Sequence, residues 1–224
     1  MRIAVDYTAA ARQGGGIGRY ARELVAALLV ADDEDEFVLM AASAGIGERW
    51  RAEQDRLRAL AALPEQLTFR SLPITDDWMA RIWQRLQVPL PADLITGPVD
   101  WFYSPDFVLP PLRPSTRSLL TVHDLSFLRH PDTFPPPLLR YLKQAVPRSV
   151  ARADHILADS DATRDDLIRL LDVSPRRVTT LYSGVSPVFD TAATENERAR
   201  LQERYDIGSH PFILTVGTVQ PRKN

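Results

Sequence analysis

A histidine and an aspartate stand together where an apolar stretch of the chain ends. Residues 118–123 read Ser-Leu-Leu-Thr-Val-His, and Asp124 follows. This pattern predicts a buried strand with His123 at its carboxyl end, where α/β folds place ligand-binding groups. A neutral imidazole there can donate to or accept from a ligand hydroxyl, and Asp124 can orient the ring or cap the next turn. The alternative is a histidine with a purely structural role.

Hydrolase chemistry and metal binding have little support. Ser160, His123 and Asp159 supply the residue types of a catalytic triad, but no Gly-x-Ser-x-Gly turn surrounds the serine. Ser160 instead precedes an amphipathic stretch at 162–171, where a serine typically caps a helix. The chain has no cysteine and no His-x-x-x-His spacing, so we expect no metal.

Four glycines cluster between the first predicted strand and the first long helix, at Gly14, Gly15, Gly16 and Gly18. The spacing Gly16-x-Gly18-x-x-Ala21 matches the dinucleotide fingerprint formally. Residues 8–13 intervene after the strand, however, and residues 40–43 offer no acid to hold a ribose. We therefore expect a loop that lets a ligand approach backbone N–H groups at a helix N-terminus. A loop that serves only chain geometry is the alternative.

Strand and helix patterns alternate along the chain, which predicts an α/β fold: a Rossmann-like, mainly parallel sheet with helices on both faces. We expect strands at 3–7, 37–42, 67–72, 101–104, 118–123, 154–159 and 177–181. We expect helices at 18–30, 48–63, 78–88, 136–152, 162–171 and 195–205. The stretch 78–88 carries tryptophans and arginines that favour a membrane surface, although packing onto the sheet is the first interpretation.

The last residues resemble the start of another domain. Residues 212–219 predict a buried strand that leads into a polar, basic turn, and such strands need neighbours on both sides. We therefore expect one domain over 1–186, followed by an interdomain segment and the truncated first unit of a second domain over 187–224.

Composition sets broad limits. The 224 residues carry a net charge of −2 with both signs interspersed, which does not indicate nucleic-acid binding. The chain has no apolar run near the roughly 20 residues that span a bilayer, and its N-terminus becomes polar too early for a signal peptide. The absence of cysteine fits a reducing compartment, so the cytoplasm is the expected location.

Five motifs, in their order along the chain, resemble family 4 glycosyltransferases, which are retaining nucleotide-sugar enzymes of the GT-B fold. They are Gly-Gly-Ile-Gly-Arg-Tyr at 15–20, Thr-Val-His-Asp-Leu-Ser-Phe at 121–127, Ala-Asp-Ser-Asp-Ala-Thr-Arg-Asp-Asp-Leu at 158–167, Tyr-Ser-Gly-Val-Ser-Pro-Val-Phe at 182–189 and Val-Gly-Thr-Val-Gln-Pro-Arg-Lys-Asn at 216–224. The resemblance covers essentially the whole chain. It implies the N-terminal half of a GT-B fold, in which the first domain mainly holds the acceptor and the second the nucleotide sugar.

The resemblance also implies roles for individual residues. It places His123 beside the transferred sugar as the catalytic residue of this chain. Lys223, with Arg222, matches the basic pair that meets the donor diphosphate, where a fixed cation stabilises the leaving group. The other expected donor or acceptor contacts are Gly15, Gly16, Gly18, Arg19, Asp124 and Ser160.

The implied reaction is a hexosyl transfer, of mannose or glucose, from a nucleoside-diphosphate sugar to a glycan or lipid-linked acceptor. No metal cofactor and no nucleic acid are implied, and contact with the inner face of the membrane is compatible with such an acceptor. The family's catalytic glutamates lie deep in the second domain, so we expect the chain alone to be inactive. Alternatives are a stand-alone acceptor-binding module or a subunit completed by a separate donor-domain chain. A different Rossmann-like enzyme, such as an epimerase, would need the missing ribose-binding acid.

Overall fold

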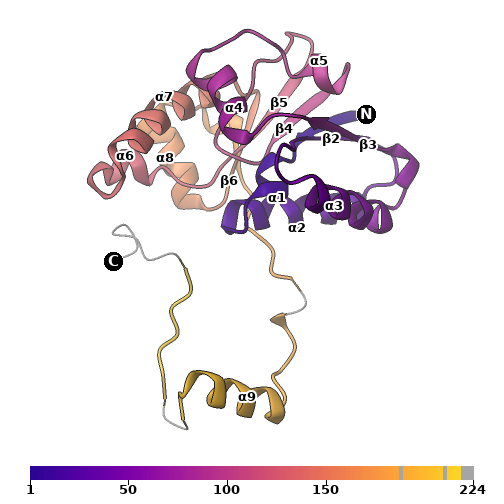
Figure 1. The fold of residues 1–224 in the computed structure, drawn as a ribbon. Helices are drawn as coiled ribbons and strands as arrows, with labels where there is room; N and C mark the ends of the chain where they lie inside the picture. The colour runs from indigo at the N-terminus through magenta and orange to yellow at the C-terminus, as the bar shows by residue number, and fades with distance from the viewer. Residues whose placement is uncertain (187–188, 209–210, 218–224) are drawn as a thin grey trace. The chain divides into compact units, whose positions relative to one another are not determined.

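The computed structural model describes residues 1–186, 189–208 and 211–217. The chain forms two compact units, residues 1–183 and 184–224, and each is described by itself. The first unit contains a seven-stranded sheet in the order β3-β2-β1-β4-β5-β6-β7, with every neighbouring pair parallel (Figure 1). The strands are β1 (Arg2–Asp6), β2 (Glu36–Ala42), β3 (Leu67–Leu72), β4 (Trp101–Ser104), β5 (Arg117–Val122), β6 (His155–Ala158) and β7 (Val178–Thr180).

Helices cover both faces of this sheet, so the predicted Rossmann-like α/β class is confirmed. They are α1 (Thr8–Arg12), α2 (Gly16–Ala31), α3 (Gly47–Leu60), α4 (Asp76–Ala80), α5 (Asp93–Thr96), α6 (Ser126–Arg129), α7 (Pro136–Arg152) and α8 (Asp161–Leu171). A π-helical turn, η2 (Arg81–Arg85), continues α4, and single 3₁₀ turns lie at η1 (Pro64–Gln66), η3 (Pro131–Thr133) and η4 (Pro175–Arg177).

Two hydrophobic cores, one on each face, explain why the strands are apolar throughout. Val38 and Met40 of β2 face a core that includes residues of α7 and α8, whereas Leu39 and Ala41 face a core built with α2 and α3. Successive side chains of a strand point to opposite faces, so a central strand must be apolar at nearly every position. The uninterrupted apolar run at residues 37–42 is the sequence pattern expected of such a central strand.

The structure departs from the predicted elements at several places in the first unit: the short helices α5 and α6 and the 3₁₀ turns were not predicted, and the predicted helix 48–63 ends at Leu60 as α3. Residues 8–12 form α1, a single short helix that the predictions left as part of the loop. The predicted helix 78–88 is instead α4 followed by η2, and it ends at Arg85. Met79, Ile82 and Trp83 pack on the core as first expected, but Trp78 and Leu86 are exposed.

The second unit contains α9 (Glu195–Tyr205), at the predicted bounds. The Thr194 side chain accepts from the Glu197 backbone N–H, and the Glu197 carboxylate accepts in return from the Thr194 backbone N–H, which defines the helix start. The predicted strand from Phe212 is wrong for the part of it that the structure describes, since residues 211–217 have no strand conformation. A parallel strand needs a hydrogen-bonded neighbour, and these residues pair with no strand among the described residues.

Candidate functional site

The strand order places one edge of the sheet in the position where α/β folds bind ligands. The chain winds outward from β1 to β2 and β3, then returns to place β4 on the other side of β1. The carboxyl ends of β1 and β4 therefore border the point where the winding direction reverses, and a crevice forms there. Asp6 ends β1, and the loop Pro105–Phe107 follows β4.

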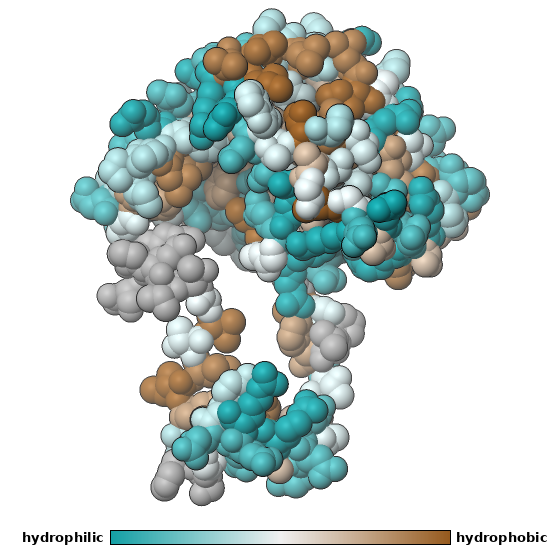
Figure 2. Space-filling view, viewed as in Figure 1, coloured by the Kyte–Doolittle hydropathy of each residue, from teal (hydrophilic) through white to brown (hydrophobic). Residues whose placement is uncertain are grey.

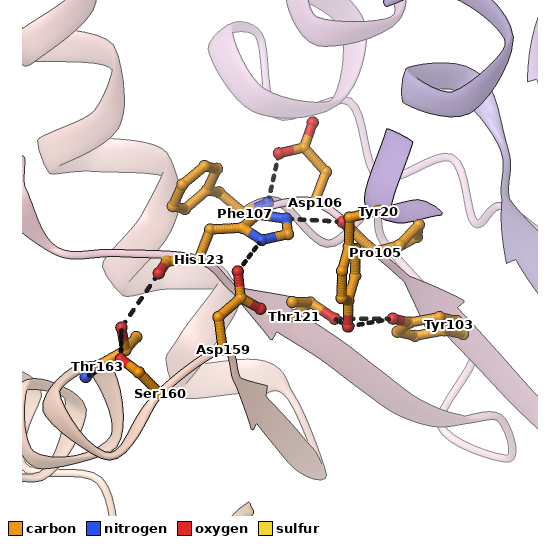
Figure 3. A network of polar contacts seen from close by, with 10 residues as sticks. All are labelled: Tyr20, Tyr103, Pro105, Asp106, Phe107, Thr121, His123, Asp159, Ser160 and Thr163. Atoms are coloured by element: carbon orange, nitrogen blue, oxygen red, sulfur yellow. Dashed lines mark hydrogen bonds and ion pairs between the residues drawn. The ribbon is translucent and has the colours of Figure 1, made fainter. Parts of the chain in front are cut away.

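An imidazole–carboxylate pair lies at the carboxyl ends of β5 and β6. Val122 pairs with Ala158 in the sheet, so the next residues, His123 and Asp159, emerge side by side. His123 Nδ1 lies 2.7 Å from Asp159 Oδ2, and Nε2 lies 3.0 Å from the carbonyl oxygen of Pro105 (Figure 3). The side chain of His123 is only 9% exposed. The pair therefore joins three neighbouring strand ends.

Both ring nitrogens of His123 face oxygen acceptors, which calls for a proton on each and hence for the cationic ring. Burial acts against this charge and is the largest single effect, but the hydrogen bond and charge of Asp159, helped by the Pro105 carbonyl, outweigh it and raise the pKa of His123. The neutral imidazole with a nitrogen available to a ligand, expected from the sequence, is not what the structure shows. The reason is that protein acceptors occupy both nitrogens.

Aromatic rings hold the imidazole on two sides and link it to α2. The rings of Tyr20 and Phe107 contact it edge-on, with centroids 5.0 Å and 5.3 Å away. The Tyr20 hydroxyl lies within 3.4 Å of the hydroxyls of Tyr103 and Thr121, which are themselves 2.8 Å apart (Figure 3). Since Tyr20 lies one turn after Gly16, the start of α2 and the histidine occupy the same edge of the sheet.

The glycines divide into two kinds. Gly15, the N-cap of α2, and Gly16, its first residue, are exposed, and a Cβ on either would meet nothing within 4 Å. Gly18 is buried, and a Cβ there would lie 2.4 Å from the carbonyl oxygen of Gln13. Gly18 is thus required for the close approach of α2 to the end of α1, while Gly15 and Gly16 leave the helix N-terminus open. Arg19 is exposed next to them.

The remaining predicted site residues hold turns in place. The Asp124 carboxylate accepts from the backbone N–H of Ser126 at 2.9 Å, at the start of α6, so it caps this turn, which is one of the two roles expected for it. Ser160 caps α8 by accepting from the Thr163 N–H at 3.1 Å, as its position in the sequence predicts. No hydrogen bond joins Ser160 to the imidazole, and the triad geometry is absent. Arg222 and Lys223 lie outside the described residues.

A cavity of about 290 Å³ opens at the end of β1, next to the loop that contacts the His123–Asp159 pair. Its polar wall includes Asp6 and Asp106, and its apolar wall includes Trp83 and Tyr141. The loop after β4 connects the cavity to the histidine: the Pro105 carbonyl and the Phe107 ring contact the imidazole, and Asp106, between them, lines the cavity. Such a concave site with aromatic walls and a few convergent polar groups is typical of a small-molecule site.

The pKa values of the two cavity carboxylates, Asp6 and Asp106, are raised above their ordinary values. Burial raises the pKa of Asp6 to about 6, against hydrogen bonds from Thr8 that lower it, and the nearby charge of Asp106 raises it further. Burial likewise raises the pKa of Asp106, although the Phe107 N–H, 2.7 Å from its Oδ1, opposes this. Carboxylates whose pKa values are raised by burial in a cleft are candidates for a functional site. In the described part of the chain, no cluster of three or more His, Cys, Asp or Glu side chains has the arrangement of a metal site.

Comparison with known proteins identifies the family. The family model of Glycosyltransferase Family 4 matches residues 14–189. The chain belongs to Glycosyltransferase Family 4. It is 28% identical over 211 residues to O-antigen chain mannosyltransferase B of Escherichia coli, covering 93% of this chain and 54% of that protein. It is 32% identical over 110 residues to alpha-D-kanosaminyltransferase of Streptomyces kanamyceticus, covering 47% of this chain and 28% of that protein.

Solved structures with low sequence identity share the fold of this Family 4 chain. Anabaena Alr3699/HepE, in complex with UDP and glucose, superposes with a TM-score of 0.52 at 13% identity, over 92% of this chain and 50% of that chain. A glycosyltransferase from Rickettsia africae gives a TM-score of 0.50 at 12% identity, over 93% of this chain and 50% of that chain. The predicted GT-B half-fold is thereby confirmed. The chain spans about half the length of the mannosyltransferase and of both solved structures.

Most of the cavity residues were not predicted from the sequence. Asp6 falls within the predicted strand 3–7, and Asp106 lies two residues after the predicted strand 101–104. A usable signal did exist for both, since each carboxylate lies near the end of an apolar strand, at the edge where His123 was expected. Tyr141 and Trp83 carried no such signal, because the packing of α7 and η2 over the strand ends brings them there.

Proposed function

We propose that this chain is the acceptor-side part of a retaining glycosyltransferase of polysaccharide biosynthesis. It moves a hexosyl group, mannose or glucose, from a nucleoside-diphosphate sugar to a glycan or lipid-linked acceptor. The observation that carries the proposal is the cavity at the end of β1, which adjoins the His123–Asp159 pair at the ligand-binding edge of a Family 4 fold. The matched mannosyltransferase and the HepE complex with UDP-glucose support the choice of sugar and donor class.

In this proposal the acceptor sugar occupies the cavity. Asp6 and Asp106 accept hydrogen bonds from its hydroxyl groups, and the faces of Trp83 and Tyr141 cover its apolar C–H surface. The donor phosphates lie by the N-terminus of α2, where exposed Gly15 and Gly16 leave the backbone N–H groups open. We also propose that Arg222 and Lys223 contact the diphosphate.

His123 positions the transferred sugar in this proposal. Its Nε2 proton points to the Pro105 carbonyl in the structure, and a sugar hydroxyl that displaces this carbonyl would receive the same hydrogen bond. Since Asp159 balances the imidazolium, the pair adds no net charge to the site. Transfer needs no metal in this proposal, and the chain acts in the cytoplasm, peripherally at the inner face of the membrane.

The division of labour between two domains can be tested by transfer assays. We expect no transfer of radiolabelled hexose by the isolated chain. We expect transfer once the chain is joined to the product of its downstream coding sequence or mixed with a separately encoded donor-domain chain. The Asp6→Asn and Asp106→Asn variants should raise the acceptor KM, whereas Asp77→Asn, on the exposed rim of the same cavity, should not. Turnover by the chain alone, or none with any nucleoside-diphosphate hexose after completion, would contradict the proposal.

A further inference from the structure

Exposed apolar side chains gather on one face of the first unit. Figure 2 shows hydrophobic residues grouped at the top, over α4 and α5. After η2 and in α5, the side chains of Leu86, Val88, Leu90 and Leu94 have exposed fractions of 70%, 38%, 43% and 55%. The loop that presents them is fixed, because Trp83 Nε1 donates to the Leu90 carbonyl at 2.9 Å. These side chains are therefore held outward by a defined backbone.

Seven basic side chains lie on this segment and on two segments close to it, and all three segments lack acids. Residues 78–92, 109–113 and 136–152 contain no aspartate or glutamate. Their basic residues, all exposed, are Arg81, Arg85, Arg113, Arg140, Lys143, Arg148 and Arg152. Since the whole chain carries a net charge of −2, the rest of it carries −9. Positive charge is thus concentrated on the apolar face. We call these seven residues and the four apolar ones the docking face.

The apolar loop, the 109–113 segment and the end of α7 lie together. A depression of about 430 Å³ is lined by Gln87 and Pro89 from the apolar loop, by Pro111, and by Arg148 and Arg152 of α7. The Arg152 guanidinium also donates to the carbonyl of Leu109, which ties the end of α7 to the 109–113 segment. Arg140, Arg148 and Arg152 are spaced by multiples of four, so they follow one side of α7.

The charges of this face have no counterpart in the first unit. None of the seven basic side chains forms an ion pair with a carboxylate among the residues described. Burial, and after it the charge of Arg148, lower the pKa of Arg152. Like charges held together beside exposed leucines fit a ligand that is both anionic and apolar.

We propose that the docking face binds the surface of an anionic lipid bilayer. Leu86, Val88, Leu90 and Leu94 enter the boundary between headgroups and acyl chains, and the seven basic residues contact the anionic headgroups. Among the described residues, no helix is long and apolar enough to cross a bilayer. This inference rests on the proposed function, since it names the membrane surface from which a lipid-linked acceptor would be used.

Vesicle flotation with the whole chain tests the inference. Vesicles of phosphatidylcholine with phosphatidylglycerol should carry the chain at low salt, and those of phosphatidylcholine alone should not. Arg148→Gln with Arg152→Gln should weaken binding roughly thirtyfold, at about one fivefold step per basic residue. Leu86→Ser with Leu90→Ser should weaken it at least about tenfold. Matched changes outside the face, Arg51→Gln and Leu170→Ser, should leave binding within about twofold.

Three outcomes would overturn the inference. They are no flotation with anionic vesicles, equal flotation with neutral vesicles, and binding that the arginine pair abolishes while the leucine pair does not affect it. The last result would indicate a site for a soluble anion. The altered side chains are exposed, and circular dichroism of each variant confirms its folding. The assay contains no sugar donor, so failed flotation rejects the membrane surface and the peripheral location but not the transfer reaction, and failed transfer rejects the enzymatic proposal alone.

Discussion

Replacing Asp6 by asparagine should stabilise the protein while weakening the acceptor site. The carboxylate of Asp6 lies at the inner wall of the cavity, and burial raises its pKa from 3.8 to about 6. The folded state therefore binds a proton more tightly than the unfolded chain does, and ionising Asp6 in the folded state costs stability. Asparagine keeps the oxygen that accepts from the Thr8 N–H, 3.0 Å away, and removes the charge.

The magnitude follows from the pKa shift. A rise from 3.8 to about 6 corresponds to about 3 kcal/mol of lost stability at pH 7.5, and to about half of that at pH 5. Water in the cavity screens part of this cost, so we expect Asp6→Asn to gain about 1–2 kcal/mol at pH 7.5. The sign is fixed by linkage: the penalty is absent below pH 3.8, grows as the pH rises, and is complete above pH 6.

Urea unfolding followed by tryptophan fluorescence, at several values between pH 5 and pH 8, measures this difference. The gain of Asp6→Asn over the native chain should increase with pH and level off near neutrality. Asp77→Asn, an exposed carboxylate on the same cavity, should change stability by less than about 0.5 kcal/mol at every pH. A gain in stability that is independent of pH, or a loss at pH 7.5, would refute the conclusion that the ionised Asp6 carboxylate destabilises the folded protein.

Two further variants test the elements around the histidine. Gly18→Ala should cost roughly 2–3 kcal/mol in urea unfolding, because its Cβ would lie 2.4 Å from the carbonyl oxygen of Gln13, while Gly14→Ala should stay within about 0.5 kcal/mol; equal effects would contradict the packing role. Asp159→Asn should lower the pKa of His123 in an NMR titration, since it removes the carboxylate that stabilises the cation. In the native chain, the stability contributed by the His123–Asp159 pair is complete below the histidine's ordinary pKa of 6.5 and is lost as the pH rises through the higher folded value. An unchanged pKa of His123 in the variant would count against the pairing.

The sheet was predictable because its strands are buried on both faces. Runs such as 37–42 and 67–72 are apolar or β-branched at most positions, and each recurs after a helix-length segment. Local patterns therefore fixed both the type and the order of the elements. α1 was missed because five residues, Thr-Ala-Ala-Ala-Arg, are too short to show a helical period. The break of the 78–88 helix into α4 and η2 also escaped, because no proline or glycine within residues 76–86 marks it.

The site was predictable only as far as strand ends could be recognised. His123 followed directly from its strand, but its partner required the knowledge that β5 and β6 are neighbours in parallel register, which puts 123 beside 159. Asp124, next in sequence, was the natural guess, yet adjacent residues leave a strand end in different directions. The cavity lay further from reach, because its aromatic wall comes from α7 and η2, far from Asp6 in the sequence.

The turn η2 connects the two proposals physically. Trp83 and Gln84 line the cavity beside Asp6 on one side and the depression of the docking face on the other. Gln84 Nε2 donates to the Leu109 carbonyl, 3.2 Å away, which fixes the turn against the segment that also receives Arg152. A π-helical turn is rare and is often found at functional sites, since its extra residue redirects side chains. If the docking face lies on the bilayer, the headgroup of a lipid-linked acceptor is separated from the proposed acceptor cavity by only this turn. A lipid anchor and its sugar can then occupy the two sides of η2 without any movement of the sheet.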